Sequence, residues 1–451
     1  MANDASSSDV PRLPREPIRL VVDPFLRFLH FETASGIVLI VATLAALVLA
    51  NSAVADAFAA FWKTPIGIQV GAFRMQHSLR HWINDGLMTI FFFVIGLEVK
   101  REVVLGELRE FRRAILPVVA AIGGMVFPAA IYLSLQFGEA GMRGWGIPMA
   151  TDIAFVVGCM ALLGSRVPHS LRVLLLSLAI ADDIGAILVI AVGYTESLNL
   201  NALLFGFAGI VVISVLARLG ARSLAVYSIL GVLVWLAFHE SGVHATIAGV
   251  LIGFMTPAKS YIDQSLFARF LDSAKNVMED WHAQPNRAQQ VRAFRKVTRE
   301  TISPLEFLED ALHPWSSFVI MPIFALANAG VAFRADDVTA PVSLAVMAGL
   351  VVGKPAGIVL LSWATVKLGL AKLPDSLSWG LMGAGGALAG IGFTMALFIA
   401  GLALDGHLLE TAKVGILAGS VISAVIGMSL LVWLLPKTVP EVPVKEDPIN
   451  D

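Results

Sequence analysis

Stretches of apolar residues long enough to cross a lipid bilayer recur along almost the whole chain. A transmembrane helix needs about 20 consecutive apolar residues to cross roughly 30 Å of hydrocarbon. Such windows lie at residues 34–52, 83–99, 114–136, 145–163, 171–193, 202–218, 223–239, 241–257, 316–333, 343–366, 377–402 and 412–435. Because lipid offers no partners to backbone polar groups, open-ended spanning segments must be helical. The pattern predicts an all-α membrane protein with twelve transmembrane helices.

The composition agrees with lipid as the main solvent. Hydrophobic residues make up 57 % of the chain and charged residues only 15 %, whereas a soluble domain carries about 25 % charged residues. The mean hydropathy is +0.79. The net charge of −2 gives no case for a nucleic-acid partner, and the single cysteine, Cys159, leaves no disulfide framework.

The windows divide the chain into five predicted regions. These are a cytoplasmic N-terminal segment, spans one to eight, a cytoplasmic amphipathic and basic loop, spans nine to twelve, and a cytoplasmic tail, at 1–33, 34–257, 258–315, 316–435 and 436–451. The polar opening of the chain lacks the apolar core and cleavage site of a signal peptide, so we expect the first span to stay in the mature protein.

Lysine and arginine placement predicts the orientation, because cytoplasmic loops carry an excess of both. With both termini in the cytoplasm, the 258–315 loop adds eight of these residues to the inner side. The inner side also holds Arg12, Arg15, Arg19, Arg27, Lys100, Arg101, Arg109, Arg112, Arg113, Arg166, Arg172, Arg218 and Arg222. The outer side holds Lys63, Arg74, Arg80, Arg143, Arg334 and Lys413. We therefore expect a multi-pass protein of a bacterial inner membrane.

Two stretches outside the spans have readable structure. Apolar residues repeat at helical spacing from Leu266 to Trp281, which predicts an amphipathic helix in the 258–315 loop. This helix is expected on the cytoplasmic membrane surface, and a regulatory or partner-binding role is the alternative. Residues 66–73 alternate around glycines in the manner of a β-hairpin.

Four charged residues lie well inside predicted spans, away from the span ends, where insertion scales assign each about 2.5 to 3.5 kcal/mol. Asp182 and Asp183 lie halfway along the fifth span, Lys354 halfway along the tenth, and Asp152 inside the fourth. A purely structural ion pair between an aspartate and the lysine would explain one pair and leave two carboxylates unexplained. These residues therefore indicate an ion-binding or proton-carrying site.

Helix-breaking residues interrupt the fourth and eleventh spans. Gly146, Pro148 and Gly158 surround Thr151 and Asp152. The eleventh span carries Gly383, Gly385, Gly386, Gly390 and Gly392. Each cluster alone fits close packing as well as unwinding. The two spans are the middle members of spans 3–5 and 10–12, however, and paired interruptions predict inverted repeats with a binding site at the membrane midplane.

Over roughly residues 23–435, the chain resembles NhaA-type sodium/proton antiporters. The stretches that carry the resemblance are 91–102 (FFFVIGLEVKRE), 146–155 (GIPMATDIAF), 179–185 (AIADDIG), 242–251 (GVHATIAGVL), 313–315 (HPW), 325–331 (ALANAGV), 353–355 (GKP) and 389–394 (AGIGFT). This sequence departs from the family pattern in the extension before Arg19 and in the long 258–315 loop. The resemblance implies exchange of cytoplasmic Na⁺ or Li⁺ for external protons, moving net charge under pH control, and a homodimer formed through the 66–73 hairpin.

The resemblance also implies roles for the buried charges. Asp183 would be the main sodium ligand, and Asp182 a proton-carrying partner that pairs with Lys354 when the ion is absent. Asp152 would offset the positive ends of the broken helices and Lys354 the negative ends, with Thr151 as a further oxygen ligand. A sodium ion prefers oxygen ligands, as other hard cations do, and the same carboxylates bind protons. Burial and mutual repulsion raise carboxylate pKa values, so the two ions can compete.

Other titratable residues lie near the span ends. The resemblance places Glu98 and Glu102 at a pH-sensing cytoplasmic entrance, the alternative being an interfacial cluster that orients the helix. It places Asp85 at the exit. His244 and Glu309 match pH-response positions, although a lone histidine is often structural.

Rival functions have weaker support. The histidines of His239-Glu-Ser-Gly-Val-His244 are five residues apart, whereas the zinc-protease motif has them four apart. With no phosphate loop or nucleophile elbow, we expect neither an enzyme nor a cofactor. A channel stays an alternative, but a lysine buried among aspartates is unusual for one. The nearest rival is a sodium-coupled symporter of an organic solute, against which Asp152 occupies the helix ends that an anionic solute would use.

Overall fold

The structure is a computed structural model. It describes residues 32–70, 73–195, 198–220, 223–260, 262, 264–279, 292, 297–298 and 300–436. The predicted segment 1–33 and tail 436–451 lie almost wholly outside the described residues, as do Trp281 and most of the basic part of the 258–315 loop.

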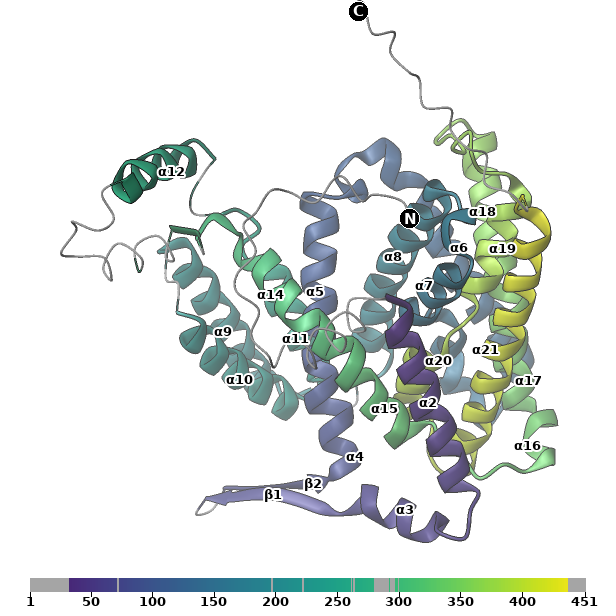
Figure 1. Cartoon of the computed structure of the whole chain (residues 1–451). Coiled ribbons are helices and arrows are strands. Elements are labelled where there is room, and N and C mark those ends of the chain that lie inside the picture. The colour runs from purple at the N-terminus through teal and green to yellow at the C-terminus, as the bar shows by residue number, and fades with distance from the viewer. Residues whose placement is uncertain are drawn as a thin grey trace, which may run out of the picture.

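Helices dominate the described chain, which confirms the all-α class (Figure 1). The α-helices are α2 (Glu32–Ala50), α3 (Ala55–Lys63), α4 (Leu79–Trp82), α5 (Met88–Val104), α6 (Phe111–Gln136), α7 (Ile153–Leu162), α8 (His169–Gly193), α9 (Leu200–Arg218), α10 (Leu224–Ser241), α11 (Thr246–Met255), α12 (Gln264–Glu279), α14 (Pro304–Trp315), α15 (Met321–Asn328), α16 (Ala335–Thr339), α17 (Pro341–Ala348), α18 (Lys354–Lys367), α19 (Trp379–Ala389), α20 (Phe393–Ala403) and α21 (Gly406–Leu434). The 3-10 helices are η2 (Glu107–Arg109), η3 (Ala140–Met149) and η4 (Gly164–Arg166). The π-helices are η1 (Ile83–Leu87), η5 (Ser316–Ile320) and η6 (Gly349–Gly353).

Each of the twelve predicted windows is occupied by helix. Among the described residues, five helices are long and apolar enough to cross a membrane, and up to eight are if each bent pair counts as one span. Two further apolar helices, α10 and α11, are shorter. The chain is therefore a multi-pass membrane protein, while the count of twelve spans stays a prediction.

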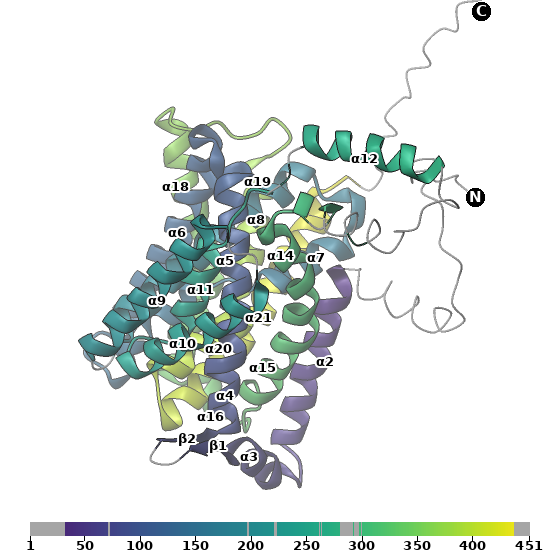
Figure 2. The same cartoon turned by 90° about the vertical axis from the view of Figure 1, so that its left-hand side faces the viewer.

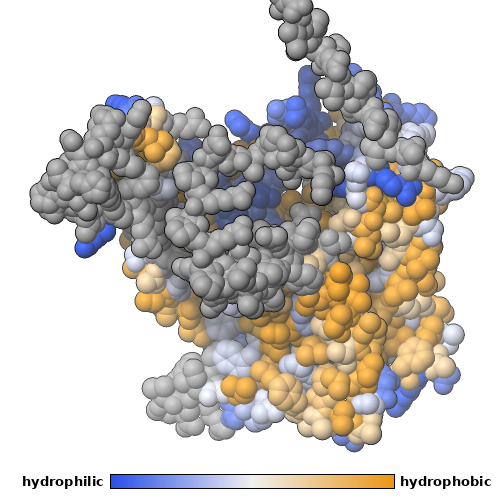
Figure 3. All heavy atoms as spheres, in the orientation of Figure 1, coloured by the Kyte–Doolittle hydropathy of each residue, from blue (hydrophilic) through white to orange (hydrophobic). Residues whose placement is uncertain are grey.

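An apolar surface covers the middle of the bundle. Figure 3 shows hydrophobic residues across the body of this face and hydrophilic ones gathered at its upper end. Leu204 and Phe205 on α9 are 66 % and 75 % exposed, and Val421 on α21 is 63 % exposed. Soluble monomers rarely expose so much contiguous apolar surface. This surface faces lipid.

The two ends of the bundle carry different elements. Strands β1 (Pro65–Val70) and β2 (Phe73–Ser78) form an antiparallel hairpin from Pro65 opposite Ser78 to Val70 opposite Phe73. The hairpin prediction is confirmed. Figures 1 and 2 both show the hairpin and α3 at one end of the bundle and α12 at the other. Helix α12 matches the predicted amphipathic helix over the residues that are described.

The predicted interruptions of the fourth and eleventh windows are present. Helices η3 and α7 meet at a 44° bend, and α19 and α20 at 49°. The breaks fall at Ala150 to Asp152 and at Gly390 to Gly392. Gly158 lies within α7, away from the break.

The glycines of the eleventh window divide between packing and unwinding. A Cβ at Gly385 would lie 3.1 Å from Leu175 of α8, so this glycine allows close packing. A Cβ at Gly390, in the break, would lie 2.4 Å from the carbonyl oxygen of Leu350. Helix α20 is buried along most of its length, so the break lies in the interior.

Close backbone contact joins α6 to α18. We expect Gly357→Ala to destabilise the protein by about 1–3 kcal/mol, as overpacking does in cores. A Cβ there would lie 2.0 Å from the carbonyl oxygen of Gly123, a backbone atom that cannot turn aside. Thermal melting of the purified protein measures the effect.

The control is Gly383→Ala in α19, where a Cβ meets nothing within 4 Å. Alanine is favoured over glycine inside a helix by about 0.5–1 kcal/mol, so this variant should melt at or above the parent temperature. A Gly357→Ala protein as stable as the Gly383→Ala control would contradict the packing role.

Candidate functional site

The two broken spans touch each other at their breaks. The backbone N–H of Asp152 donates to the carbonyl oxygen of Ile391 at 2.7 Å. The Thr151 hydroxyl lies 3.1 Å from the carbonyl oxygen of Ala389. Unwound backbone groups that would be orphaned inside lipid therefore bond across the crossing, as non-helical backbone at membrane depth requires.

Asp152 caps the N-termini of two helices at once. Its carboxylate accepts from the N–H of Phe155 in the first turn of α7 at 3.3 Å. It also accepts from the N–H of Thr394 at 3.1 Å and from the Thr394 hydroxyl, in the first turn of α20. Asp152 is 1 % exposed. A carboxylate here offsets the positive ends of both helix dipoles, the position that the resemblance implied.

The Lys354 side chain lies at the C-terminal end of a helix, where the helix dipole is negative. Its ammonium donates to the carbonyl oxygen of Met149, the last residue of η3. It also forms an ion pair with Asp182 of α8, with 2.6 Å between Nζ and Oδ2 and both side chains fully buried. The π-helix η6 ends immediately before Lys354; such bulges are frequent at functional sites. The sequence-predicted pair of Asp182 and Lys354 is present.

Two neighbouring aspartates of α8, Asp182 and Asp183, have carboxylate oxygens without a partner among the described residues. The second oxygen of Asp182, Oδ1, is buried with no hydrogen bond to the described residues, whereas Oδ2 lies 2.5 Å from the Thr151 hydroxyl. Asp183 is 3 % exposed and makes no hydrogen bond or ion pair within the described chain. Buried charge without a partner is costly. Stability alone therefore does not explain this pair of aspartates.

Residues from α5 and α14 form an ionic cluster at one end of the bundle. Glu98 Oε1 lies 3.4 Å from His313 Nδ1, and Arg101 pairs with Glu309. Burial raises the pKa of Glu309, and Arg101 opposes that rise. The negative charge of Glu98 raises this pKa further. The structure thus brings together two predicted residues, Glu98 and Glu309.

Glu102 lies one helical turn beyond Glu98 and faces a cavity. Its carboxylate accepts from the N–H of Glu107 at 2.9 Å and from the Ser177 hydroxyl at 3.3 Å. The cavity has a volume of about 350 Å³. Its charged lining residues are Glu102, Glu107, Arg109, Glu110 and Arg113.

The predicted residues Asp85 and His244 lie toward the hairpin end. Asp85 Oδ2 is 3.5 Å from nitrogens of both His81 and His239. The His244 ring contacts Phe398 of α20 edge to face, with 6.3 Å between centroids. Asp85 and the pair of Glu98 and Glu102 thus lie at opposite ends of η1 and α5.

Comparison with known proteins decides the family. The family model described as Na⁺/H⁺ antiporter 1 matches residues 26–431. The chain belongs to the Na⁺/H⁺ antiporter 1 family. A relative from Rhodopirellula baltica, named Na⁺/H⁺ antiporter NhaA, is 56 % identical over 94 % of this chain and 97 % of its own length. Proteins of the same name from Rhizobium meliloti (52 % identical, 95 % and 98 % covered) and, as NhaA 2, from Vibrio vulnificus (47 %, 94 % and 95 %) are similar along their length.

Three site residues of this antiporter-family chain were missed by reasoning from sequence. Thr394 donates hydrogen bonds to the capping residue Asp152. Arg101 pairs with Glu309, and His313 lies beside Glu98. All three lie within stretches that carried the family resemblance. Thr394 lies in the first turn after the glycine break, but nothing in the sequence indicates that it donates to Asp152 of another span. The partners of Arg101 and His313 depend on how α5 packs against α14.

Proposed function

We propose that the chain exchanges cytoplasmic Na⁺ or Li⁺ for external protons, with the ion and protons competing for Asp183 and Asp182. The observation that carries the proposal is the buried Asp183, without a partner in the described chain, beside the pair of Asp182 and Lys354. Carboxylate and hydroxyl oxygens suit a hard monovalent cation. Asp183, the free oxygen of Asp182 and the Thr151 hydroxyl supply them.

The ion pair of Asp182 and Lys354 provides a second proton carrier for the transport cycle, in addition to Asp183. When Na⁺ binds Asp183 and Asp182, Lys354 loses its partner and can release a proton. When the ion leaves, Asp182 and Lys354 pair again and protons return. Two proton sites against one sodium ion would let more protons than sodium ions cross in each cycle. Exchange would then be electrogenic.

The proposed orientation assigns each end of the bundle to one side of the membrane. We place the hairpin end outside and the α12 end, with both chain termini, in the cytoplasm of a bacterial cell. Twelve spans with inverted repeats 3–5 and 10–12 complete this topology, and α12 would lie on the inner membrane surface. Glu102 and its cavity then form the entrance, and Asp85 lines the exit. The hairpin would join two copies in a homodimer.

Proteoliposomes test the transport function. With an imposed pH gradient and a pH-sensitive dye, adding Na⁺ or Li⁺ should collapse the gradient, and choline should not. Collapse by K⁺ as strong as that by Na⁺, or no collapse by any of the cations, would contradict the proposed exchange.

The cluster of Glu98, Arg101, Glu309 and His313 supports control by pH, with Glu102 beside it and His244 toward the outer end. The raised pKa of Glu309 keeps this carboxyl protonated to higher pH than an ordinary glutamate. As pH rises through that pKa, Glu309 becomes charged and its pairing with Arg101 strengthens. We therefore propose that ion exchange is activated when the pH rises above the pKa of Glu309.

Glu98→Gln should move the curve of activity against pH to lower pH, with little change in maximal exchange. Removing the charge of Glu98 lowers the pKa of Glu309, because that charge helps raise it. His244→Asn should also shift the curve, and Asp375→Asn, at an exposed carboxylate between α18 and α19, should not. Initial rates across a pH series measure this. Unshifted curves for both Glu98→Gln and His244→Asn would remove them from pH sensing.

A further inference from the structure

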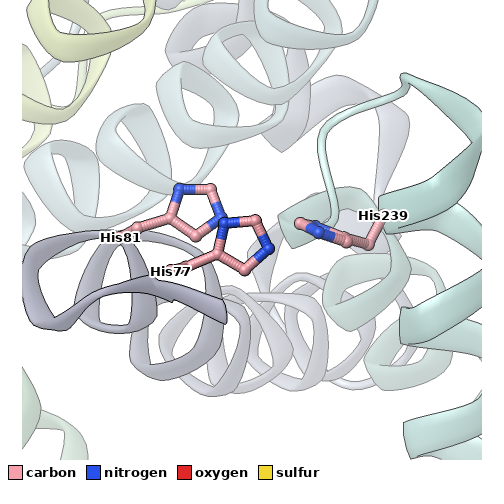
Figure 4. A group of neighbouring side chains, drawn as sticks. All are labelled: His77, His81 and His239. Atoms are coloured by element: carbon pink, nitrogen blue, oxygen red, sulfur yellow. The ribbon is translucent and has the colours of Figure 1, made fainter. Parts of the chain in front are cut away.

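Three histidines from three secondary-structure elements lie close together at the hairpin end. His77 is in β2, His81 in α4 and His239 in α10. One imidazole nitrogen of each lies within 4.8 Å of the others. Figure 4 shows the rings of His77 and His81 beside each other, with the ring of His239 facing them from another helix.

The surroundings hold His239 in place. The His239 ring stacks on Trp235 with 5.7 Å between centroids. Trp235 in turn donates to the Thr89 hydroxyl at 3.0 Å, and Trp82 stacks on Trp235. Two rings locked by hydrogen bonds and stacking therefore fix the position of His239 on α10.

One nitrogen without a hydrogen bond and a nearby carboxylate indicate a cation site. His81 Nε2 is buried and has no hydrogen-bond partner among the described residues. Asp85 Oδ2 lies 3.5 Å from this nitrogen and 3.5 Å from His239 Nδ1. Three imidazoles and a nearby carboxylate form a ligand set that suits zinc and similar divalent transition metals.

We propose that His77, His81 and His239 form a binding site for a divalent transition-metal ion, with zinc as the best fit and Asp85 or water as fourth ligand. Tetrahedral zinc with Zn–N bonds near 2.0–2.1 Å requires nitrogens about 3.3 Å apart. The nitrogens must therefore close in by side-chain rotation.

His77 is the residue that must turn. Its ring is stacked on that of His81, with 4.2 Å between centroids and 24° between planes. Nearly parallel rings cannot both direct an in-plane lone pair at one ion. His77 is only partly buried, which leaves room for the turn. A bound ion would then fasten the hairpin and α4 to α10. This site does not rest on the proposed transport function.

The test is zinc binding to the full-length chain in nanodiscs, with no histidine tag and after removal of metals by EDTA. Isothermal titration with zinc chloride should give one saturable site per chain. Cobalt(II) should give the visible absorption of a tetrahedral nitrogen site. His77→Gln and His239→Gln should each weaken zinc binding by at least about 10-fold, the smaller end of what loss of even an outer-shell partner costs.

The matched control is His407→Gln. His407 is an exposed histidine 3.8 Å from Asp337, so its loss should leave zinc affinity unchanged. His77→Cys keeps a zinc ligand and should retain binding, which guards against a glutamine variant that fails to fold. No saturable site in the parent, an equal loss in His407→Gln, or undiminished binding in both His77→Gln and His239→Gln would overturn the proposal.

Discussion

Asp183→Asn is expected to abolish sodium-dependent proton movement and to leave the protein folded in the membrane. The substitution removes the charge that we propose to bind both the cation and the proton, while the shape of the side chain is nearly kept. Asp183 makes no ion pair or hydrogen bond with the described residues, so its loss orphans no buried group. Removing a buried charge that lacks a partner should leave the melting temperature equal or higher.

Proteoliposomes containing Asp183→Asn measure the first part and thermal melting the second. Asp337→Asn is the matched control, because Asp337 is also a buried aspartate, 5 % exposed, and pairs with His407 away from the crossing. That control should exchange sodium for protons as the parent does. Near-normal exchange by Asp183→Asn would rule out Asp183 as the main ion ligand.

Lys354→Ala is expected to cause the largest loss of stability, about 3–5 kcal/mol, which is the usual effect of removing one member of a buried pair. It leaves the Asp182 carboxylate uncompensated and the carbonyl oxygen of Met149 without its donor. Asp182→Asn combined with Lys354→Gln should recover much of the loss, because no buried charge then remains unpaired. Thermal melting of the three proteins measures these differences.

Lys413→Ala is the control for burial of a lysine as such. Lys413 is 3 % exposed, but its partner Glu410 is 41 % exposed and can return to water. The loss of stability should therefore be smaller than for Lys354→Ala. Exchange that survives in Lys354 variants should be electroneutral, since only competition at Asp183 remains. A Lys354→Ala protein that is stable and still responds fully to membrane potential would contradict both the pairing and the charge-carrying role.

The sequence was enough to predict the features that follow from solvation. Charges at mid-depth of apolar windows are rare and costly, so Asp182, Asp183 and Lys354 stood out. Glycines and a proline in two corresponding windows predicted the two breaks, and alternation around glycines predicted the hairpin. These signals are local in the chain.

Features that depend on packing between distant segments could not be predicted. Nothing in sequence pairs His77 with His239, or tells which glycine of the eleventh window packs and which unwinds. The π-helices before Met88, Met321 and Lys354 add residues within helices, and each alters the direction of the side chains that follow. A periodicity of 3.6 residues cannot locate such bulges.

The proposed competition between sodium and protons is tested most directly by proton release from the purified protein. Sodium chloride is added to the parent and to Asp183→Asn in weakly buffered detergent solution at alkaline pH, with a pH indicator dye present. Choline chloride controls for ionic strength. We expect sodium to release protons from the parent in a saturable manner and none from Asp183→Asn. Saturable sodium binding to the parent without proton release, or equal release from the variant, would contradict competition at these aspartates.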